Sequence, residues 1–295
     1  MTLAYRRTAF DAPLAQYLQT SSSGVSLYWL GQAGFIIQSG GRRIVIDPYL
    51  SDYLAQKYQG RPLAHQRMEA APISVDGLGR VDLVLSTHHH SDHMDPLTLA
   101  PLAQTNPQVS FVVPRASLDE ARQRIGVHDS RLLDIEAGER IEALPGVWIS
   151  AARACHETLE RDAQGNHRFL GYLIEIDGVR IFHSGDTIPY PGQVEELRAL
   201  QADIALLPVN GRCAELSARG VPGNLDLQEA VKLCQDCAIP FMIAHHYGLF
   251  AFNTADPETI DGWIPQVLPL NLLRAQLHTQ FNFTRSSASA RPRLT

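Results

Sequence analysis

The chain has 295 residues, 45% hydrophobic and 19% charged, which is the balance of a globular protein rather than a disordered or fibrous one. Its formal charge of −6 and the lack of a Lys/Arg stripe count against a nucleic-acid binder. No run approaches the roughly 18 apolar residues of a membrane span, and no apolar leader follows Met1. We therefore expect a cytoplasmic protein.

Residues 1–24 are expected to form a peripheral extension, and strands and helices then follow in alternation. Apolar and β-branched runs between turn residues predict strands at Val25–Leu30, Gly34–Gln38, Arg43–Asp47, Val81–Ser86, Val109–Val113, Val147–Ala154, Gly171–Ile176, Val179–His183, Asp203–Leu207 and Phe241–His245. Helical spacing and capping residues predict helices from Asp95 to about Gln104, from a Ser117/Glu120 capping box to about Gly126, and over Gly192–Leu200 and Asp226–Cys237.

This order predicts an α/β fold in which two sheets are covered by helices. No low-complexity linker divides the chain, so we expect a single domain over 1–295 with a loose tail at 286–295. Residues 52–77 look irregular, and a loop of that length in a compact domain is often functional.

Four cysteines in a chain of this length do not make a disulfide scaffold. Cys234 and Cys237 form a C-x-x-C, but they continue an apolar stripe at helical spacing and no second C-x-x-C completes a zinc site. We interpret them as packed thiols of the core.

The strongest chemical signal is the segment His88-His89-His90-Ser91-Asp92-His93. At an extended strand end, His88 and His90 point the same way and can converge on one ion. Asp92 and His93 follow where the chain bends, and they can face a second ion. Imidazole and carboxylate ligands suit zinc, manganese or iron.

Further candidate ligands follow other apolar runs. His156, Asp186 and the pair His245-His246 each come directly after a predicted strand, so all can gather at one edge of the sheets. Singly, each would be an ordinary strand-end residue; jointly, they indicate a metal site.

The order H-x-H-x-D-H, a lone histidine, S-G-D-T and a terminal histidine resembles the metallo-β-lactamase superfamily over residues 25–265. The resemblance implies a four-layer αβ/βα sandwich with two divalent ions, zinc first and manganese or iron as alternatives. It implies one ion on His88, His90 and His156. The second ion would lie on Asp92, His93 and His246, with Asp186 bridging. His245 and His89 are left in supporting positions.

Other motifs, such as Trp29–Phe35 and Ile46-Asp47-Pro48-Tyr49, resemble the L-ascorbate-6-phosphate lactonase group. In that resemblance, Asp47 is a buried residue that supports the metal loop. The N-acyl-phosphatidylethanolamine phospholipase D group shares several of these motifs, so the superfamily is better indicated than the substrate.

For catalysis, the sequence predicts attack by a metal-activated hydroxide, with Asp92 holding it and accepting its proton. His183 is either a proton donor to the leaving group or a packed strand histidine. Arg212 and Arg219 are candidate contacts to an anionic substrate, with solvated loop arginines as the alternative, and Tyr247 is a candidate pocket residue.

We therefore expect a hydrolase of a small-molecule lactone or phosphoester. A phosphodiesterase or nuclease acting on nucleotides and a non-catalytic metal-binding protein are the alternatives. The expected partner is a small anionic substrate, with neither nucleic acid nor membrane, and a homo-oligomer is left open.

Overall fold

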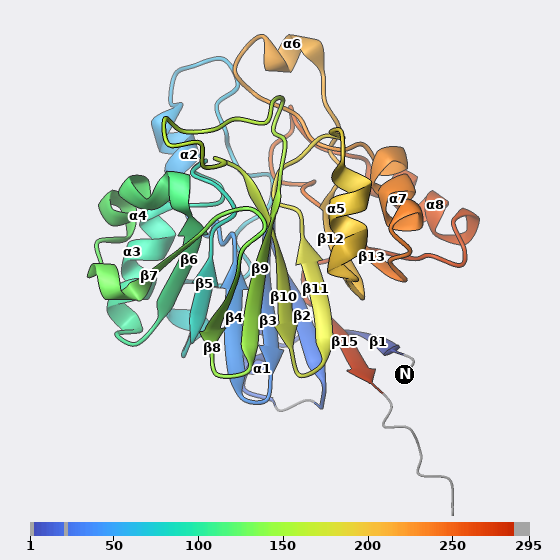
Figure 1. The fold of residues 1–295 in the computed structure, drawn as a ribbon, viewed down its shortest axis with the longest axis horizontal. Helices are drawn as coiled ribbons and strands as arrows, with labels where there is room; N and C mark the ends of the chain where they lie inside the picture. Colours follow the sequence, from blue (N-terminus) through green and yellow to red (C-terminus); the bar gives the residue numbers. More distant parts are fainter. Residues whose placement is uncertain (1–2, 21–22, 286–295) are drawn as a thin grey trace, which may run out of the picture.

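Two mixed β-sheets packed face to face form the centre of the computed structural model, which describes residues 3–20 and 23–285 (Figure 1). The first sheet contains, in spatial order, β1 (Leu3–Ala9), β15 (Thr279–Arg285), β2 (Val25–Gly31), β3 (Gly34–Ser39), β4 (Arg42–Ile46), β5 (Leu83–Leu85), β6 (Ser110–Pro114) and β7 (Leu132–Ile135). The second contains β14 (Asn271–Arg274), β13 (Phe241–His245), β12 (Ile204–Pro208), β11 (Val179–His183), β10 (Leu170–Ile176), β9 (Val147–Arg153) and β8 (Arg140–Leu144).

Helices cover the outer faces of both sheets, as Figure 1 shows. The helices of the described residues are α1 (Leu14–Tyr17), α2 (Tyr53–Lys57), α3 (Pro96–Thr105), α4 (Leu118–Ile125), α5 (Gln193–Leu200), α6 (Ala214–Ser217), α7 (Leu227–Asp236) and α8 (Pro257–Trp263), of which α2 and α6 lie at one end of the sandwich. Helices α3 and α4 lie on the side of the first sheet, and α5, α7 and α8 lie on the side of the second. The predicted four-layer αβ/βα sandwich is therefore confirmed.

Alternation along the strands builds the core. In β3, Phe35 and Ile37 point to the cluster between the two sheets, whereas Ile36 points to the cluster beneath α3 and α4. Because successive side chains of a strand face opposite ways, a strand covered on both faces is apolar throughout. The predicted packed thiols are also confirmed: Cys234 and Cys237 are free and buried in the larger cluster.

Two local predictions differ from the structure. Residues 3–9 do not lie outside the sheets as an extension would, because they pair with β15 as the edge strand β1. Ser117 makes no capping bond to α4; it ends a 3-10 turn instead. The predicted tail at 286–295 lies outside the described residues. No helix among the described residues is long and apolar enough to cross a bilayer.

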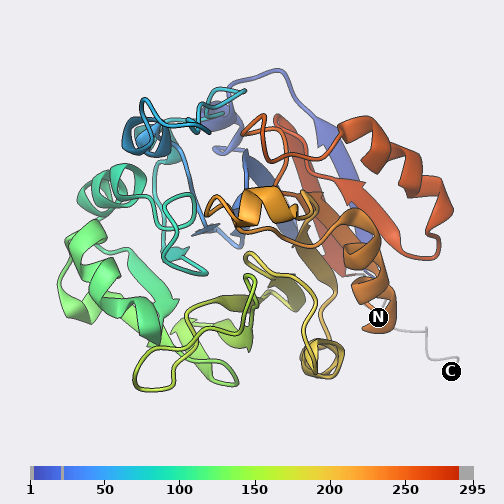
Figure 2. The same ribbon diagram turned by 90° about the horizontal axis from the view of Figure 1, so that it is seen from above.

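Segments that follow strands of both sheets meet at one end of the sandwich. The cluster 88–93 follows β5 of the first sheet, and Asp186 and His246 follow β11 and β13 of the second. Figure 2 looks onto this end and shows the α6 segment crossing the middle of the molecule above the strand ends. This arrangement brings the candidate ligands together.

Candidate metal centre

The histidine cluster lies in a turn whose backbone is held at both ends. The N–H groups of His93 and Met94 donate to the carbonyl of His90, at 3.0 and 2.8 Å. Asp95 then caps α3, because its side chain accepts from the Leu97 N–H at 3.0 Å. The cluster is therefore a fixed turn and not a loose polyhistidine loop.

Asp47 orients the cluster from behind. It follows β4 in a left-handed conformation with φ of 45° and is fully buried. Its carboxylate accepts from the Thr87 N–H at 2.8 Å and the Thr87 hydroxyl at 2.6 Å. It also lies 2.7 Å from His93 Nδ1. With Nδ1–H held by Asp47, Nε2 of His93 is left free to face the centre.

Two further histidines are oriented in the same way. Nδ1 of His88 lies 3.1 Å from the Thr87 hydroxyl oxygen, and Nδ1 of His156 lies 3.1 Å from the Gly223 carbonyl. When Nδ1–H donates to these oxygens, each Nε2 keeps a lone pair for a metal. Thr87 and the loop at Gly223 were absent from the sites predicted from sequence.

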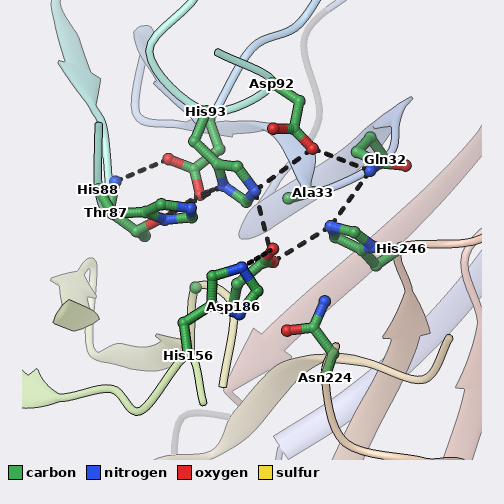
Figure 3. A network of polar contacts seen from close by, with 12 residues as sticks. Gln32, Ala33, Thr87, His88, Asp92, His93, His156, Asp186, Asn224 and His246 are labelled. Atoms are coloured by element: carbon green, nitrogen blue, oxygen red, sulfur yellow. Dashed lines mark hydrogen bonds and ion pairs between the residues drawn. The ribbon is translucent and has the colours of Figure 1, made fainter. Parts of the chain in front are cut away.

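The side chains form three groups whose ligand atoms lie within 4.8 Å of one another: His88/His90/His156, His88/His93/Asp186 and Asp92/His93/His246. Asp186 lies between the groups (Figure 3). Its Oδ1 is 3.1 Å from His246 Nε2 and 3.4 Å from His93 Nε2, and its Oδ2 is 3.6 Å from His156 Nε2. The two outer groups contain the residues that the resemblance implied for the two ions, and Asp186 lies between them.

Buried polar atoms in the centre fit a cation. His88 Nε2 is buried without a hydrogen-bond partner among the described residues, and His93 Nε2 is buried facing the carboxylates of Asp186 and Asp92 at 3.4 and 3.7 Å. Burial alone lowers the pKa of His93, but Asp186, Asp47 and Asp92 raise it well above its usual range. Such a concentration of carboxylates stabilises positive charge at this point, and the nitrogen and oxygen donors suit a divalent metal.

His246 rather than His245 faces the centre. His246 adopts φ of 65°, which directs its side chain to Asp186. His245 is fully buried behind it, against the rings of Phe35 and His183 at 5.4 and 5.0 Å.

His183 has no free ring atom for the proton-donor role. Its Nε2 lies 2.8 Å from the Ala33 carbonyl, and its Nδ1 accepts from the Gly185 N–H at 3.0 Å. Burial lowers its pKa, and the ring does not line the pocket at the metal centre. Of the two alternatives for His183, a proton donor or a packed strand histidine, the structure therefore favours the packed histidine.

The three predicted substrate residues also lie outside this pocket. Arg212 is bound to Glu229 of α7 by two bonds of 2.5 and 2.6 Å, and Arg219 is exposed just after α6. Tyr247 is buried with its hydroxyl on the Ala275 carbonyl, and its ring stacks on Trp29 at 5.1 Å. It lines a second pocket, to which its neighbour His246 does not belong.

The pocket over the metal centre has a volume of about 200 Å³. Its floor contains His90, Asp92, His156, Asp186 and His246, and its walls come from the α2 segment, from residues 220–222 after α6 and from residues 250–253. The prediction of a functional loop at 52–77 agrees with this lining, since the pocket is also lined by Leu54, Lys57, Tyr58 and His65.

Gln32 is a pocket residue that the sequence did not single out. It lies in the turn between β2 and β3 with φ of 49°, and only 2% of it is exposed. Its amide nitrogen donates to Asp92 Oδ2 at 3.0 Å and lies 3.2 Å from His246 Nε2 (Figure 3). Its backbone carbonyl accepts from the His246 N–H and from Trp29 Nε1, both at 3.0 Å. Gln32 therefore links two candidate ligands from different sheets.

Comparison with known proteins gives a consistent family. A sequence profile described as the Beta-lactamase superfamily domain matches residues 42–247. A metal-dependent hydrolase of Pelotomaculum thermopropionicum is 32% identical over 235 residues, which cover 78% of this chain and 87% of that protein.

Two solved structures share the fold. A metallo hydrolase from Ignicoccus hospitalis aligns with a TM-score of 0.66 and 19% identity, covering 90% of this chain and all of that one (100%). An isothiocyanate hydrolase from Delia radicum gut bacteria aligns with a TM-score of 0.68 and 18% identity, covering 88% and 100%.

Proposed function

The chain belongs to the beta-lactamase superfamily, and we propose from this premise that it is a metal-dependent hydrolase of a small-molecule lactone or phosphoester. The observation that carries the proposal is the set of three overlapping groups of candidate ligands, whose members His90, Asp92, His156, Asp186 and His246 form the floor of one pocket. The motifs that resemble the L-ascorbate-6-phosphate lactonase group favour a lactone among these substrates.

We propose two divalent ions at these groups, with zinc as the first candidate and manganese or iron as alternatives. His88, His90 and His156 would hold one, and Asp92, His93 and His246 the other, with Asp186 between them. Divalent ions held there supply Lewis-acid activation of water near neutral pH and charge stabilisation at the reacting oxygen.

Asp92 is the residue placed to move a proton. Its carboxylate lines the pocket, and Oδ2 is fixed by the Gln32 amide at 3.0 Å, so the group can hold an attacking water and take its proton. Burial raises the pKa of Asp92, but the neighbouring His93 and His246 lower it below its usual value overall. Asp92 is therefore ionised as a base must be.

A pocket of about 200 Å³ supports a small substrate, or the reacting end of a larger one. All four cysteines are free, as a reducing compartment would leave them, and we propose that the enzyme works in the cytoplasm.

The test is turnover by the protein loaded with zinc, manganese or iron, using sugar lactones and bis-p-nitrophenyl phosphate. We expect cleavage of at least one substrate class, lost in Asp92→Asn and retained in the control Asp119→Asn, whose exposed side chain pairs with Arg122 on the surface of α4. Cleavage of the phosphodiester alone would favour the nucleotide phosphodiesterase alternative. Cleavage of neither class with any of the metals would contradict the proposal.

A further inference from the structure

Two cationic side chains stand at the pocket without an anionic partner. Lys57 is the last residue of α2, and its ammonium lies 3.4 Å from the Ser91 hydroxyl, one residue before Asp92. The Arg124 guanidinium donates to the backbone carbonyls of His89 and Met94. Within residues 3–20 and 23–285, neither side chain lies within ion-pair distance of a carboxylate.

The environment of Lys57 makes its charge available to a ligand. Burial and the nearby Arg124 lower the pKa of Lys57, and Asp92 raises it. If Asp92 ligates a metal ion, its charge is already neutralised, so Lys57 gains little from it. A cation in this position is stabilised by an incoming anion.

Arg212, one of the two arginines named as candidate substrate contacts, has a different environment from that of Lys57 and Arg124. The fork of Arg212 is occupied by the Glu229 carboxylate, which also completes the capping box of α7. Lys57 and Arg124 thus replace Arg212 as the cations that face the pocket.

An aromatic wall lies beside the two cations. The His65 ring stacks on Tyr58 at 4.5 Å and meets Phe250 and Phe252 edge-on at 5.0 and 4.8 Å. Burial lowers the pKa of His65, so the ring is neutral near pH 7. All four residues line the pocket, and they come from segments almost 200 residues apart, 58–65 and 250–252. The wall offers aromatic surface to an apolar or flat group.

We propose that Lys57, with Arg124 behind it, binds an anionic oxygen group of the substrate while a planar or apolar part lies against the wall of Tyr58, His65, Phe250 and Phe252. The inference rests on the proposed function and narrows it. The hydrolysed lactone or phosphoester carries a carboxylate or phosphate away from the bond that breaks.

Binding of small probes tests the anion site independently of turnover. Benzoate, phenyl phosphate and benzyl alcohol share a ring and differ in charge, and each is titrated calorimetrically into the zinc-loaded full-length chain. We expect both anions to bind more tightly than the alcohol. Lys57→Gln should weaken both anions about fivefold, which is the worth of a partly exposed charge pair. Lys57→Arg should retain their affinity.

The chain contains its own matched control, because its other lysine, Lys232, pairs with Asp236 on the surface of α7. Lys232→Gln should bind all three probes as the unmodified protein does. The aromatic wall is tested by Phe252→Leu, which should weaken benzoate and benzyl alcohol alike while leaving acetate, which has no ring, unchanged.

The outcomes separate the two proposals. Unchanged affinity of Lys57→Gln for both anions would overturn the anion site, as would equal affinity of the unmodified protein for benzyl alcohol and benzoate. Loss of benzoate alone or of phenyl phosphate alone would identify which anion the site accepts. If the probes behave as expected but no lactone or phosphoester is cleaved, the anion site stands and the hydrolase proposal fails.

Discussion

Asp47 shows how one buried carboxylate can hold the candidate ligands of a metal without being one of them. It holds Thr87 through both the backbone N–H and the hydroxyl, and it holds His93 through Nδ1. Thr87 in turn contacts His88 Nδ1. One carboxylate therefore orients histidines of both proposed ions.

We expect Asp47→Asn to lower zinc affinity about 10- to 100-fold, the usual cost of losing such a supporting partner. The isosteric amide keeps the packing but brings an NH₂ group against the Thr87 and His93 donors. Competition with a chromogenic chelator measures the change, with Asp119→Asn as the control. An affinity equal to that of the unmodified protein would show that Asp47 does not orient the ligands.

Gln32 should matter to one ion more than the other, because its amide contacts Asp92 and His246 but none of His88, His90 and His156. We expect Gln32→Ala to weaken the second zinc equivalent about tenfold and to spare the first. Metal titration with elemental analysis distinguishes the first zinc equivalent from the second. Gln38→Ala, in the same hairpin with its amide on the Leu18 carbonyl, is the control. Equal weakening of both equivalents would contradict this role.

For single residues, the sequence predicted the site where the candidate ligands are close together in the chain. It did not predict the positions of side chains that depend on contacts with distant residues. The cluster 88–93 carries its own spacing, so its convergence could be predicted. Tyr247 could not be placed, because the left-handed turn at His246 sends its ring to Trp29 and the second pocket. Arg212 was a candidate contact to the substrate, with a solvated loop arginine as the alternative, and it is in fact bound to Glu229, 17 positions along the chain.

Among the elements, the turn after β11, which carries Asp186, packs closely against β10 and against Thr87. Gly185 has φ of 60°, and a Cβ there would lie 2.8 Å from the Leu170 carbonyl oxygen and 2.9 Å from Thr87 Cβ. Any side chain would displace Thr87 and the adjacent Asp186.

We expect Gly185→Ala to be destabilised by about 2–4 kcal/mol, since a left-handed alanine costs about 1–2 kcal/mol and overpacking adds a similar amount. Gly138→Ala is the matched control: its φ is +85°, and nothing lies within 4 Å of its Cβ position. It should show the backbone cost alone, without loss of metal affinity. Urea denaturation measures the stability of the two variants, and zinc titration measures their metal affinity. Equal effects of Gly185→Ala and Gly138→Ala would show that the close contacts of Gly185 do not cause the loss of stability.

The sequence predicted strands accurately where both faces of the strand are apolar, and it predicted them poorly at the edges of the sheets. Val179–His183 and Phe241–His245 were predicted with their observed bounds, because buried runs end at clear turn residues. The strand β1 was missed, since none of its residues is buried and its partner β15 lies about 270 positions away. Pairing at that separation leaves no local pattern to detect.

For the whole molecule, the candidate metal centre brings together residues from both sheets. Its ligands follow β5 of the first sheet and β9, β11 and β13 of the second, so bound metal should stabilise the packing between them. At a free zinc concentration 100 times Kd, one site adds about 2.7 kcal/mol to the free energy of unfolding.

We therefore expect chelation to lower the Tm by several degrees and zinc to restore it, as measured by calorimetry. Asp186→Ala should lower metal occupancy at both positions and lose most of this zinc-dependent rise. A chelator-insensitive Tm in protein shown to bind zinc would mean that the centre does not contribute to joining the sheets. Fewer than two metals per chain at saturation would defeat the two-ion assignment.

The stack of Trp29 on Tyr247 gives the molecule an internal optical reporter. The indole N–H donates to the Gln32 carbonyl, which also accepts from the backbone N–H of His246. The indole is therefore connected to the candidate ligand His246 in two ways, through Gln32 and through Tyr247, the next residue in the chain. Trp148 lies beneath Arg140 and Trp263 ends α8, both away from it. Zinc should therefore change the tryptophan emission of the unmodified protein, and Trp29→Phe should abolish that change while zinc still binds. A persistent signal in Trp29→Phe would assign the emission change to another indole.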